Sequence, residues 1–178
     1  DAVPATYALD VYPDAVSLAA DGGLRQIKLF DALRNDVAGA AAGTLYWSSN
    51  NAIVAMSPDG LMTGRAAGEA IVTVVHAGAE FRIPVRVLTP LVGANTVTRD
   101  GGVVRSPEGY VVAVAPGALV RDATVSIARL DLSGLAAPLP PASAGFDAAA
   151  AFRLDLGDVP LAEPVQLAIP TGLAPGTQ

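Results

Sequence analysis

Residues 70–76 read Ala-Ile-Val-Thr-Val-Val-His, and residues 24–30 read Leu-Arg-Gln-Ile-Lys-Leu-Phe. Successive side chains of a β-strand point to opposite faces, so each stretch divides into two sets. In the first stretch the sets are Ile71, Thr73 and Val75 against Val72, Val74 and His76. In the second they are Leu24, Gln26, Lys28 and Phe30 against Arg25, Ile27 and Leu29. Both stretches are therefore expected to be strands with one protected face.

Similar short runs recur about every ten residues and are separated by Gly, Pro, Asn and Asp, which is typical of an all-β sandwich. In the first half the expected strands are 7–11, 15–18, 24–30, 44–48, 53–56, 61–63, 70–76 and 81–88. In the second half new strands begin near 97–104, and the others are 102–105, 110–115, 123–130, 149–156 and 165–169. The Ala-rich run 147–152 is interpreted as strand, with a helical turn as the alternative, and 132–145 as an exposed Pro-rich loop.

The composition indicates a folded chain that lacks most reactive groups. The 178 residues are 52% apolar with a net charge of −6, which allows more burial than a disordered chain achieves. There is no Cys, so disulfides, thiolate metal sites and cysteine nucleophiles are excluded. Stability must therefore come from packing.

Charge and hydropathy exclude two classes of partner. Each half carries a net charge near −3 and neither clusters Lys or Arg, so we expect no nucleic-acid binding. The apolar run Tyr110–Ala115 ends at Pro116 and is far shorter than the ~20 residues of a membrane span. The sequence starts at Asp1 without an initiator Met or leader and ends without a closing strand, so we expect a processed protein or a segment of a longer one.

A domain boundary is expected at 88–93, where a strand ends in Pro and Gly. Residues 1–89 and 90–178 are then two tandem β-sandwiches joined by a six-residue linker. A linker this short predicts a semi-rigid arrangement.

Residues 16–88 carry an ordered set of motifs. They are 45–50 (Leu-Tyr-Trp-Ser-Ser-Asn), 53–57 (Ile-Val-Ala-Met-Ser), 59–64 (Asp-Gly-Leu-Met-Thr-Gly), 67–74 (Ala-Gly-Glu-Ala-Ile-Val-Thr-Val) and 85–87 (Val-Arg-Val). This set resembles the group 2 bacterial immunoglobulin-like (Big) domain. The resemblance implies an immunoglobulin-like sandwich in which Trp47 is the main aromatic side chain of the core. Gly60, Gly64 and Gly68 are expected where a turn needs positive φ or two backbones approach closely.

Residues 97–178 resemble the start of the ZU-five domain, a β-sandwich of zonula occludens, ankyrin and netrin-receptor proteins that also occurs in bacterial surface proteins. The markers are 101–104 (Gly-Gly-Val-Val), 109–119, 124–127 (Thr-Val-Ser-Ile) and 161–170. The later strands of that family are absent from the sequence, so this sandwich is expected to be incomplete at its C-terminus. Together the two resemblances imply tandem sandwiches of a bacterial protein that is extracellular, on the cell surface or periplasmic.

No residue is assigned a catalytic, cofactor-binding or metal-binding role. His76 is the only imidazole, and apart from Glu80 no potential ligand lies near it in sequence, so we expect a rim or surface histidine. No Gly-x-Ser-x-Gly elbow is present, which argues against acyl transfer and an enzyme of that kind.

Two binding alternatives remain open. Calcium could use acidic pairs, namely Asp10 with Asp14, Asp21 before Gly22-Gly23, Asp31 with Asp36, and Asp155 with Asp158. Turn-forming aspartates in solvent are the preferred interpretation of these pairs. A sugar could use exposed Tyr7, Tyr12 or Tyr46, since Trp47 is expected in the core.

The sequence thus predicts a non-enzymatic structural or adhesive module without a cofactor, acting as a spacer or protein-interaction segment. Its partners would be other protein chains or neighbouring domains of the same polypeptide, with self-association through edge strands. The alternatives are an accessory carbohydrate- or calcium-binding module of a larger secreted enzyme, and a filament subunit that assembles by strand addition.

Overall fold

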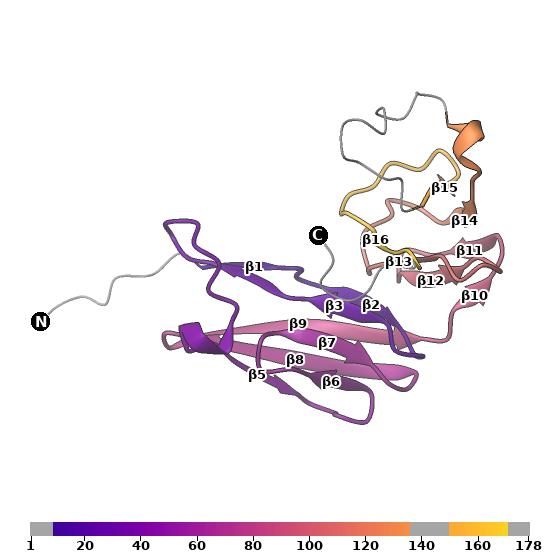
Figure 1. Ribbon diagram of the computed structural model, residues 1–178. Coiled ribbons are helices and arrows are strands. Elements are labelled where there is room, and N and C mark those ends of the chain that lie inside the picture. Colours follow the sequence, from indigo (N-terminus) through magenta and orange to yellow (C-terminus); the bar gives the residue numbers. More distant parts are fainter. Residues whose placement is uncertain (1–8, 136–149, 171–178) are drawn as a thin grey trace, which may run out of the picture. The chain divides into compact units, whose positions relative to one another are not determined.

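Strands dominate the secondary structure of the described residues, 9–135 and 150–170, which contain two short 3-10 helices and no α-helix (Figure 1). In this computed structural model the chain divides into two units, Asp1–Thr89 and Pro90–Gln178. The protein is all-β, with two tandem sandwiches. The linker is shorter than predicted, because only Thr89 and Pro90 separate the last strand of the first unit from the first strand of the second.

The described part of the first unit, residues 9–89, has nine strands and one 3-10 helix. They are β1 (Asp10–Tyr12), β2 (Val16–Ala19), β3 (Leu24–Gln26), β4 (Lys28–Phe30), η1 (Ala40–Ala42), β5 (Leu45–Ser48), β6 (Val54–Met56), β7 (Leu61–Gly64), β8 (Gly68–His76) and β9 (Ala79–Leu88). One sheet has the order β2-β9-β8-β5 and the other β3-β7-β6, with β1 and β4 forming a separate pair. Strand β2 runs parallel to β9, and the other pairs are antiparallel. This is an immunoglobulin-like order in which β2 has joined the sheet of the last strand, β9.

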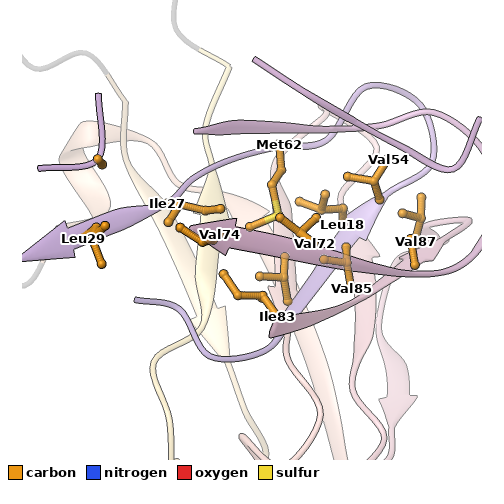
Figure 2. Close-up of a cluster of buried hydrophobic side chains, with 13 residues drawn as sticks. Leu18, Ile27, Leu29, Val54, Met62, Val72, Val74, Ile83, Val85 and Val87 are labelled. Atoms are coloured by element: carbon orange, nitrogen blue, oxygen red, sulfur yellow. The ribbon is translucent and has the colours of Figure 1, made fainter. Parts of the chain in front are cut away.

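The core of the first unit lies between its two sheets. Figure 2 shows Met62 of β7 pointing toward Val72 of β8. The largest fully buried side chains of this cluster are Leu18, Ile27, Leu29, Val54, Met62, Val72, Val74, Ile83, Val85 and Val87. The alternation expected for 24–30 and 70–76 is confirmed, since the buried residues are Ile27 and Leu29 in one and Ala70, Val72 and Val74 in the other.

The expected strand 24–30 is divided at Ile27. Strand β3 pairs with β7, whereas β4 pairs with β1. The Ile27 amide donates to the carbonyl oxygen of Gly60 at 2.9 Å, outside both ladders. The segment therefore changes partners at Ile27, which the sequence pattern did not predict.

Two glycines of the Big-like motifs occupy the positions expected of them. Gly60 ends the turn that begins at Ser57, with φ +81° and a hydrogen bond from its amide to the Ser57 carbonyl oxygen at 3.1 Å. A Cβ at Gly64 would collide with the carbonyl oxygen of Ala19. The first glycine supplies positive φ and the second permits close approach of two strands.

The described part of the second unit is a sandwich of two sheets. Its elements are β10 (Leu91–Val92), β11 (Asn95–Val97), β12 (Gly102–Arg105), β13 (Val111–Val114), β14 (Ala123–Arg129), η2 (Leu132–Gly134), β15 (Phe152–Asp155) and β16 (Gln166–Ala168). The sheet orders are β10-β12-β13-β16 and β11-β14-β15. Its buried cluster consists of Val97, Val104, Tyr110, Val112, Val114, Ala118, Leu119, Ala123, Val125, Ile127 and Val159.

The second unit differs from the sequence expectations mainly at its ends. Strand β10 was not predicted, because two residues that pair in parallel with β12 leave no alternation to detect. The alternating part of 149–156 is strand β15, whereas residues 147–149 of the Ala-rich run lie outside the described residues. The same holds for most of the predicted loop 132–145 and for the chain after residue 170.

Candidate functional site

Large apolar side chains are exposed on the outer face of sheet β2-β9-β8-β5. One row across it consists of Trp47, Thr73 and Arg82, because Trp47 pairs with Thr73 and Thr73 with Arg82. The next row consists of Leu45, Val75 and Glu80. The exposed fraction is 54% for Leu45, 52% for Trp47 and 45% for Ile71. We call Leu45, Trp47 and Ile71 together the β5 face.

The expectation that Trp47 fills the core is wrong. Strand β5 alternates, and its inward residues are Tyr46 and Ser48, so Trp47 points outward. Tyr46 packs against the core, and its hydroxyl donates a hydrogen bond to the carbonyl oxygen of Ala38 at 2.7 Å. Burial raises the pKa of Tyr46 to about 12, with smaller contributions from the carboxylates of Asp36 and Asp59. Tyr46, and not Trp47, is therefore the aromatic side chain of β5 that packs on this core, together with Phe81 of β9.

Of the three tyrosines considered for a sugar site, Tyr12 and Tyr46 lie in the described part of the chain. Tyr46 is partly buried with its hydroxyl occupied, and Tyr7 lies outside the described residues. Tyr12 is 39% exposed, and the Arg25 guanidinium lies 5.0 Å from its ring centroid. The exposed aromatic ring on a flat sheet face is instead that of Trp47.

His76 lies at the end of β8, where its Nδ1 is 2.8 Å from Oγ1 of Thr44. Thr44 is buried, and its hydroxyl proton is donated to the carbonyl oxygen of Val37. Because a hydroxyl has one proton, the Thr44 oxygen accepts from the imidazole, which places a proton on Nδ1. His76 is thus one half of a hydrogen bond that joins the end of β8 to the start of β5.

The acidic residues Asp31 and Asp36 bind neighbouring groups of the protein. Oδ1 of Asp31 accepts from the amides of Leu33 and Asn35 at 2.9 and 2.8 Å, and Oδ2 accepts from Nδ2 of Asn35 at 2.9 Å. These bonds, chiefly the one from the Asn35 side chain, lower the pKa of Asp31. Asp36 forms an ion pair with Lys28 at 2.7 Å, which lowers the pKa of Asp36. Each carboxylate thus already has protein donors.

The other acidic pairs are similarly placed in loops or at strand ends. Asp10 forms an exposed ion pair with Arg34 at 3.2 Å, and Asp155 accepts from the Gly157 amide at 2.8 Å. Among the described residues, no three His, Cys, Asp or Glu side chains gather as metal ligands.

A hollow in the second unit is lined by Tyr110, Arg129, Leu130, Asp131, Leu132, Ala150 and Ala151. Tyr110 is buried there, and its ring centroid lies 6.5 Å from that of Phe152. Arg129 and Asp131 are the charged residues of this lining. None of these residues was a site candidate on sequence grounds.

The β5 face was not predicted from the sequence, although the sequence contains a signal for it. Residues 37–58 contain no charged side chain, and this is the longest such run in a chain with 17 acidic and 11 basic residues. It includes β5 and β6. A long uncharged run with an alternating Leu-Tyr-Trp-Ser strand is the pattern of a strand with apolar side chains on both faces.

No family model matches the sequence, and no curated protein matches it. Among solved structures, the chain is similar to domains 4–9 of the surface layer protein SbsC, with 21% identity and a TM-score of 0.38, over 68% of this chain and 22% of that one. It is also similar to domains 5–6 of the S-layer protein SbsC, with 15% identity and a TM-score of 0.39, over 72% of this chain and 81% of that one. Within residues 9–135 and 150–170, no helix is long and apolar enough to cross a membrane.

Proposed function

We propose that this chain is a non-enzymatic structural or adhesive module of a bacterial cell-surface or secreted protein. It acts as a spacer or protein-interaction segment outside the cytoplasm. Its partners are other protein chains or neighbouring domains of the same polypeptide. The Big-like and ZU-five-like motifs support this proposal, as does the construction of both units as sandwiches.

The observation that carries the proposal is the contrast between the polar groups and the β5 face. In the described part of the chain, Asp31 and His76, two of the polar groups considered as site candidates, hold a loop and a strand end through hydrogen bonds with Asn35 and Thr44. The β5 face, by contrast, presents a Trp and a Leu side chain more than half exposed. Exposed large apolar side chains that lie together mark an interaction surface.

Surface labelling of the source bacterium tests the location. Intact cells are treated with a membrane-impermeant amine reagent, which can react with Lys28, whose side chain is 49% exposed. Labelling of the chain in intact cells or in the culture medium supports the proposal, and labelling only after lysis contradicts it. A cytoplasmic protein serves as the control for lysis.

A carbohydrate-binding accessory module is the second candidate, favoured by one observation. The Trp47 ring is exposed on a sheet face beside Thr73 and Arg82, which together offer a stacking surface and polar groups. Titration with soluble fragments of bacterial and plant polysaccharides, monitored by the fluorescence of Trp47, tests it. Calcium binding is tested in parallel, since a calcium-bound native state would have a higher melting temperature in millimolar calcium than in chelator.

A further inference from the structure

Strand β5 is an open edge. It is the last strand in the order β2-β9-β8-β5, and in the described part of the chain it pairs only with β8. The amide of Ser49, just after the strand, donates to the carbonyl oxygen of Ile71 at 2.9 Å. Backbone groups alternate in direction along an antiparallel strand, so those of Trp47 point toward β8 as well. The amides and carbonyls of Tyr46 and Ser48 therefore point away from the sheet.

This edge lacks the usual protection against pairing with another strand. Natural edges carry Lys, Pro, bulges or inward-pointing charges. Strand β15, at the end of a sheet in the second unit, carries Arg153 and Asp155. Strand β5 has no charge and no Pro, and it lies within the uncharged run 37–58.

The absence of charge matters most for contact between two identical chains. Each chain has a net charge of −6, so two copies repel each other in general. A two-fold axis brings each residue near its own equivalent, and any charge near the axis would face a like charge. The charge-free β5 edge avoids this repulsion, and its exposed Leu45 and Trp47 gain from burial.

We propose that β5 pairs antiparallel with β5 of a second copy of this chain, with the two-fold axis at Trp47, so that two four-stranded sheets become one of eight strands. This inference deepens the proposed function as a protein-interaction segment and rests on it. The occupant of the β5 edge is thus a second copy, joined by strand addition.

The backbone geometry selects the register. With the axis at Trp47, the outward backbone groups of Tyr46 meet those of Ser48 in the second copy, so both outward-facing residues of β5 enter the ladder. A register centred on Ser48 would pair Tyr46 of one copy with Asn50 of the other. The Asn50 carbonyl oxygen, however, already accepts from the amides of Ile53 and Val54. A register centred on Tyr46 would need Thr44, which precedes the strand. Only the register centred on Trp47 brings both outward-facing residues of β5 into the ladder without using backbone groups outside the strand.

In this register the two Trp47 residues form a non-hydrogen-bonded pair with Cα atoms ~4.5 Å apart. Leu45 of each copy lies opposite Ser49 of the other. A four-residue edge buries less than the ~1,200 Å² that separates standard complexes from weak ones, so the association is weak, with a Kd of micromolar or above. Many copies fixed on one surface would still associate, because their effective concentration is high.

Sedimentation of the 178-residue chain from about 10 μM to about 1 mM measures this association, a range set by the weak class of interface. We expect a monomer–dimer equilibrium. Trp47→Lys places two like charges next to each other on the axis. Their repulsion should cost ~1.4 kcal/mol or more, which would weaken the dimer association about tenfold or more. Leu33→Lys is the matched control, since Leu33 is 82% exposed in the loop after β4 and should leave the equilibrium unchanged.

Cysteine cross-linking then tests the register, and the absence of native Cys makes the assay specific. The double variant Leu45→Cys with Ser49→Cys is expected to form a disulfide-linked dimer, because opposed residues of this pair fall within disulfide range. Leu45→Cys alone should not, since its nearest equivalent lies about four residues away along the ladder.

Each outcome bears on the inference separately from the proposed function. A monomer up to about 1 mM, the top of the range for this class of interface, overturns the β5 inference, while surface labelling still decides the location of the chain. A dimer that survives Trp47→Lys and does not cross-link means association through another surface, which overturns the inference and keeps the interaction role. A monomer whose Trp47 emission responds to glycans overturns it in favour of sugar binding.

Discussion

The ring of Tyr46 lies directly against Gly60, so that a Cβ built on Gly60 would fall 2.7 Å from both the Cζ and the hydroxyl oxygen of Tyr46. This contact joins β5 of one sheet to the turn between β6 and β7 of the other. It explains why the inward residue of the Tyr46-Trp47 pair is the tyrosine. The ring fits over a residue without a side chain, and its hydroxyl reaches the Ala38 carbonyl.

Gly60→Ala should therefore destabilise the first unit by more than the cost of placing an alanine at positive φ. Gly78 is the matched control, because its φ of +84° is close to the +81° of Gly60 and no atom lies within 4 Å of a Cβ there. Both substitutions incur backbone strain of ~1 kcal/mol or more. Overpacking against Tyr46 should add about 1–3 kcal/mol to the Gly60→Ala loss. Equal losses in urea unfolding would contradict the contact.

Tyr46→Phe removes the hydrogen bond to Ala38 and should reduce the free energy of unfolding by about 0.5–1.5 kcal/mol at neutral pH. It should also change the alkaline stability profile. The pKa of Tyr46 is about 12 in the folded chain and near its ordinary value of 10.0 when unfolded, so the unfolded state loses its proton first. Stability from this group is complete below pH 10 and falls as the pH rises toward 12.

Urea unfolding between pH 9 and pH 12 checks this behaviour. The parent chain should lose more stability over that range than Tyr46→Phe, with the difference due to the Tyr46 hydroxyl. Parallel curves for the two proteins would mean that the hydroxyl is exposed to solvent.

Ile83 and Ile71 provide a matched pair on adjacent strands, one in the core and one on the β5 face. Ile83 is 1% exposed and Ile71 is 45% exposed. Ile83→Ala should destabilise the first unit by about 2–5 kcal/mol through lost burial and an internal cavity. Ile71→Ala should change stability by about 0.5 kcal/mol or less in dilute solution. Thermal and urea unfolding of both variants at low protein concentration provide the measurement.

The Asp31 loop can be tested by carboxyl titration. The Asn35 side chain is the main cause of the low pKa of Asp31. Asn35→Ala should raise that pKa toward the ordinary value of 3.8, and NMR titration of the Asp31 carboxyl carbon follows it directly. Because the folded pKa is lowered, this group stabilises the fold above pH 3.8 and loses that effect as the pH falls. An unchanged pKa in Asn35→Ala would show that the side-chain bond is not formed.

Ser106 is the polar residue whose removal should most affect the turn before β13. It is buried, and its Oγ accepts from the amides of Glu108 at 3.2 Å and Tyr110 at 3.3 Å. Ser106→Ala leaves the Tyr110 amide without this acceptor and should cost about 1–3 kcal/mol. Ser133→Ala, within η2, is the exposed control and should have little effect. Chemical unfolding followed by circular dichroism compares the two.

Much of the first unit could be predicted from alternation and turn chemistry. Residues 81–87 alternate apolar side chains with Arg or Pro, residues 70–76 are rich in β-branched side chains, and Ser57-Pro58-Asp59-Gly60 combines residues that each favour a turn. These signals are local, and the structure has a strand or turn at each place. The division of 24–30 at Ile27 is not local, since it depends on a hydrogen bond to Gly60, 33 positions away in the sequence.

The orientation of β5 shows where local reasoning fails. Its residues Leu-Tyr-Trp-Ser place one aromatic side chain on each face, so the pattern is compatible with either orientation. A shift of one residue exchanges the two faces of a strand. The choice depends on Gly60 and Ala38, which provide space and an acceptor for tyrosine but lie elsewhere in the chain. The β5 face could not be predicted for the same reason, because it exists only when Trp47 points outward.

Acrylamide quenching of tryptophan fluorescence tests the outward orientation of Trp47 most directly, because the chain has no other tryptophan. Because the Trp47 side chain is 52% exposed, we expect acrylamide to quench its fluorescence in the folded, dilute protein to a large fraction of the quenching seen in the urea-unfolded chain. At high concentration, pairing of β5 should reduce that quenching. Emission that is shielded in dilute folded protein and released only on unfolding would place Trp47 in the core and contradict the account.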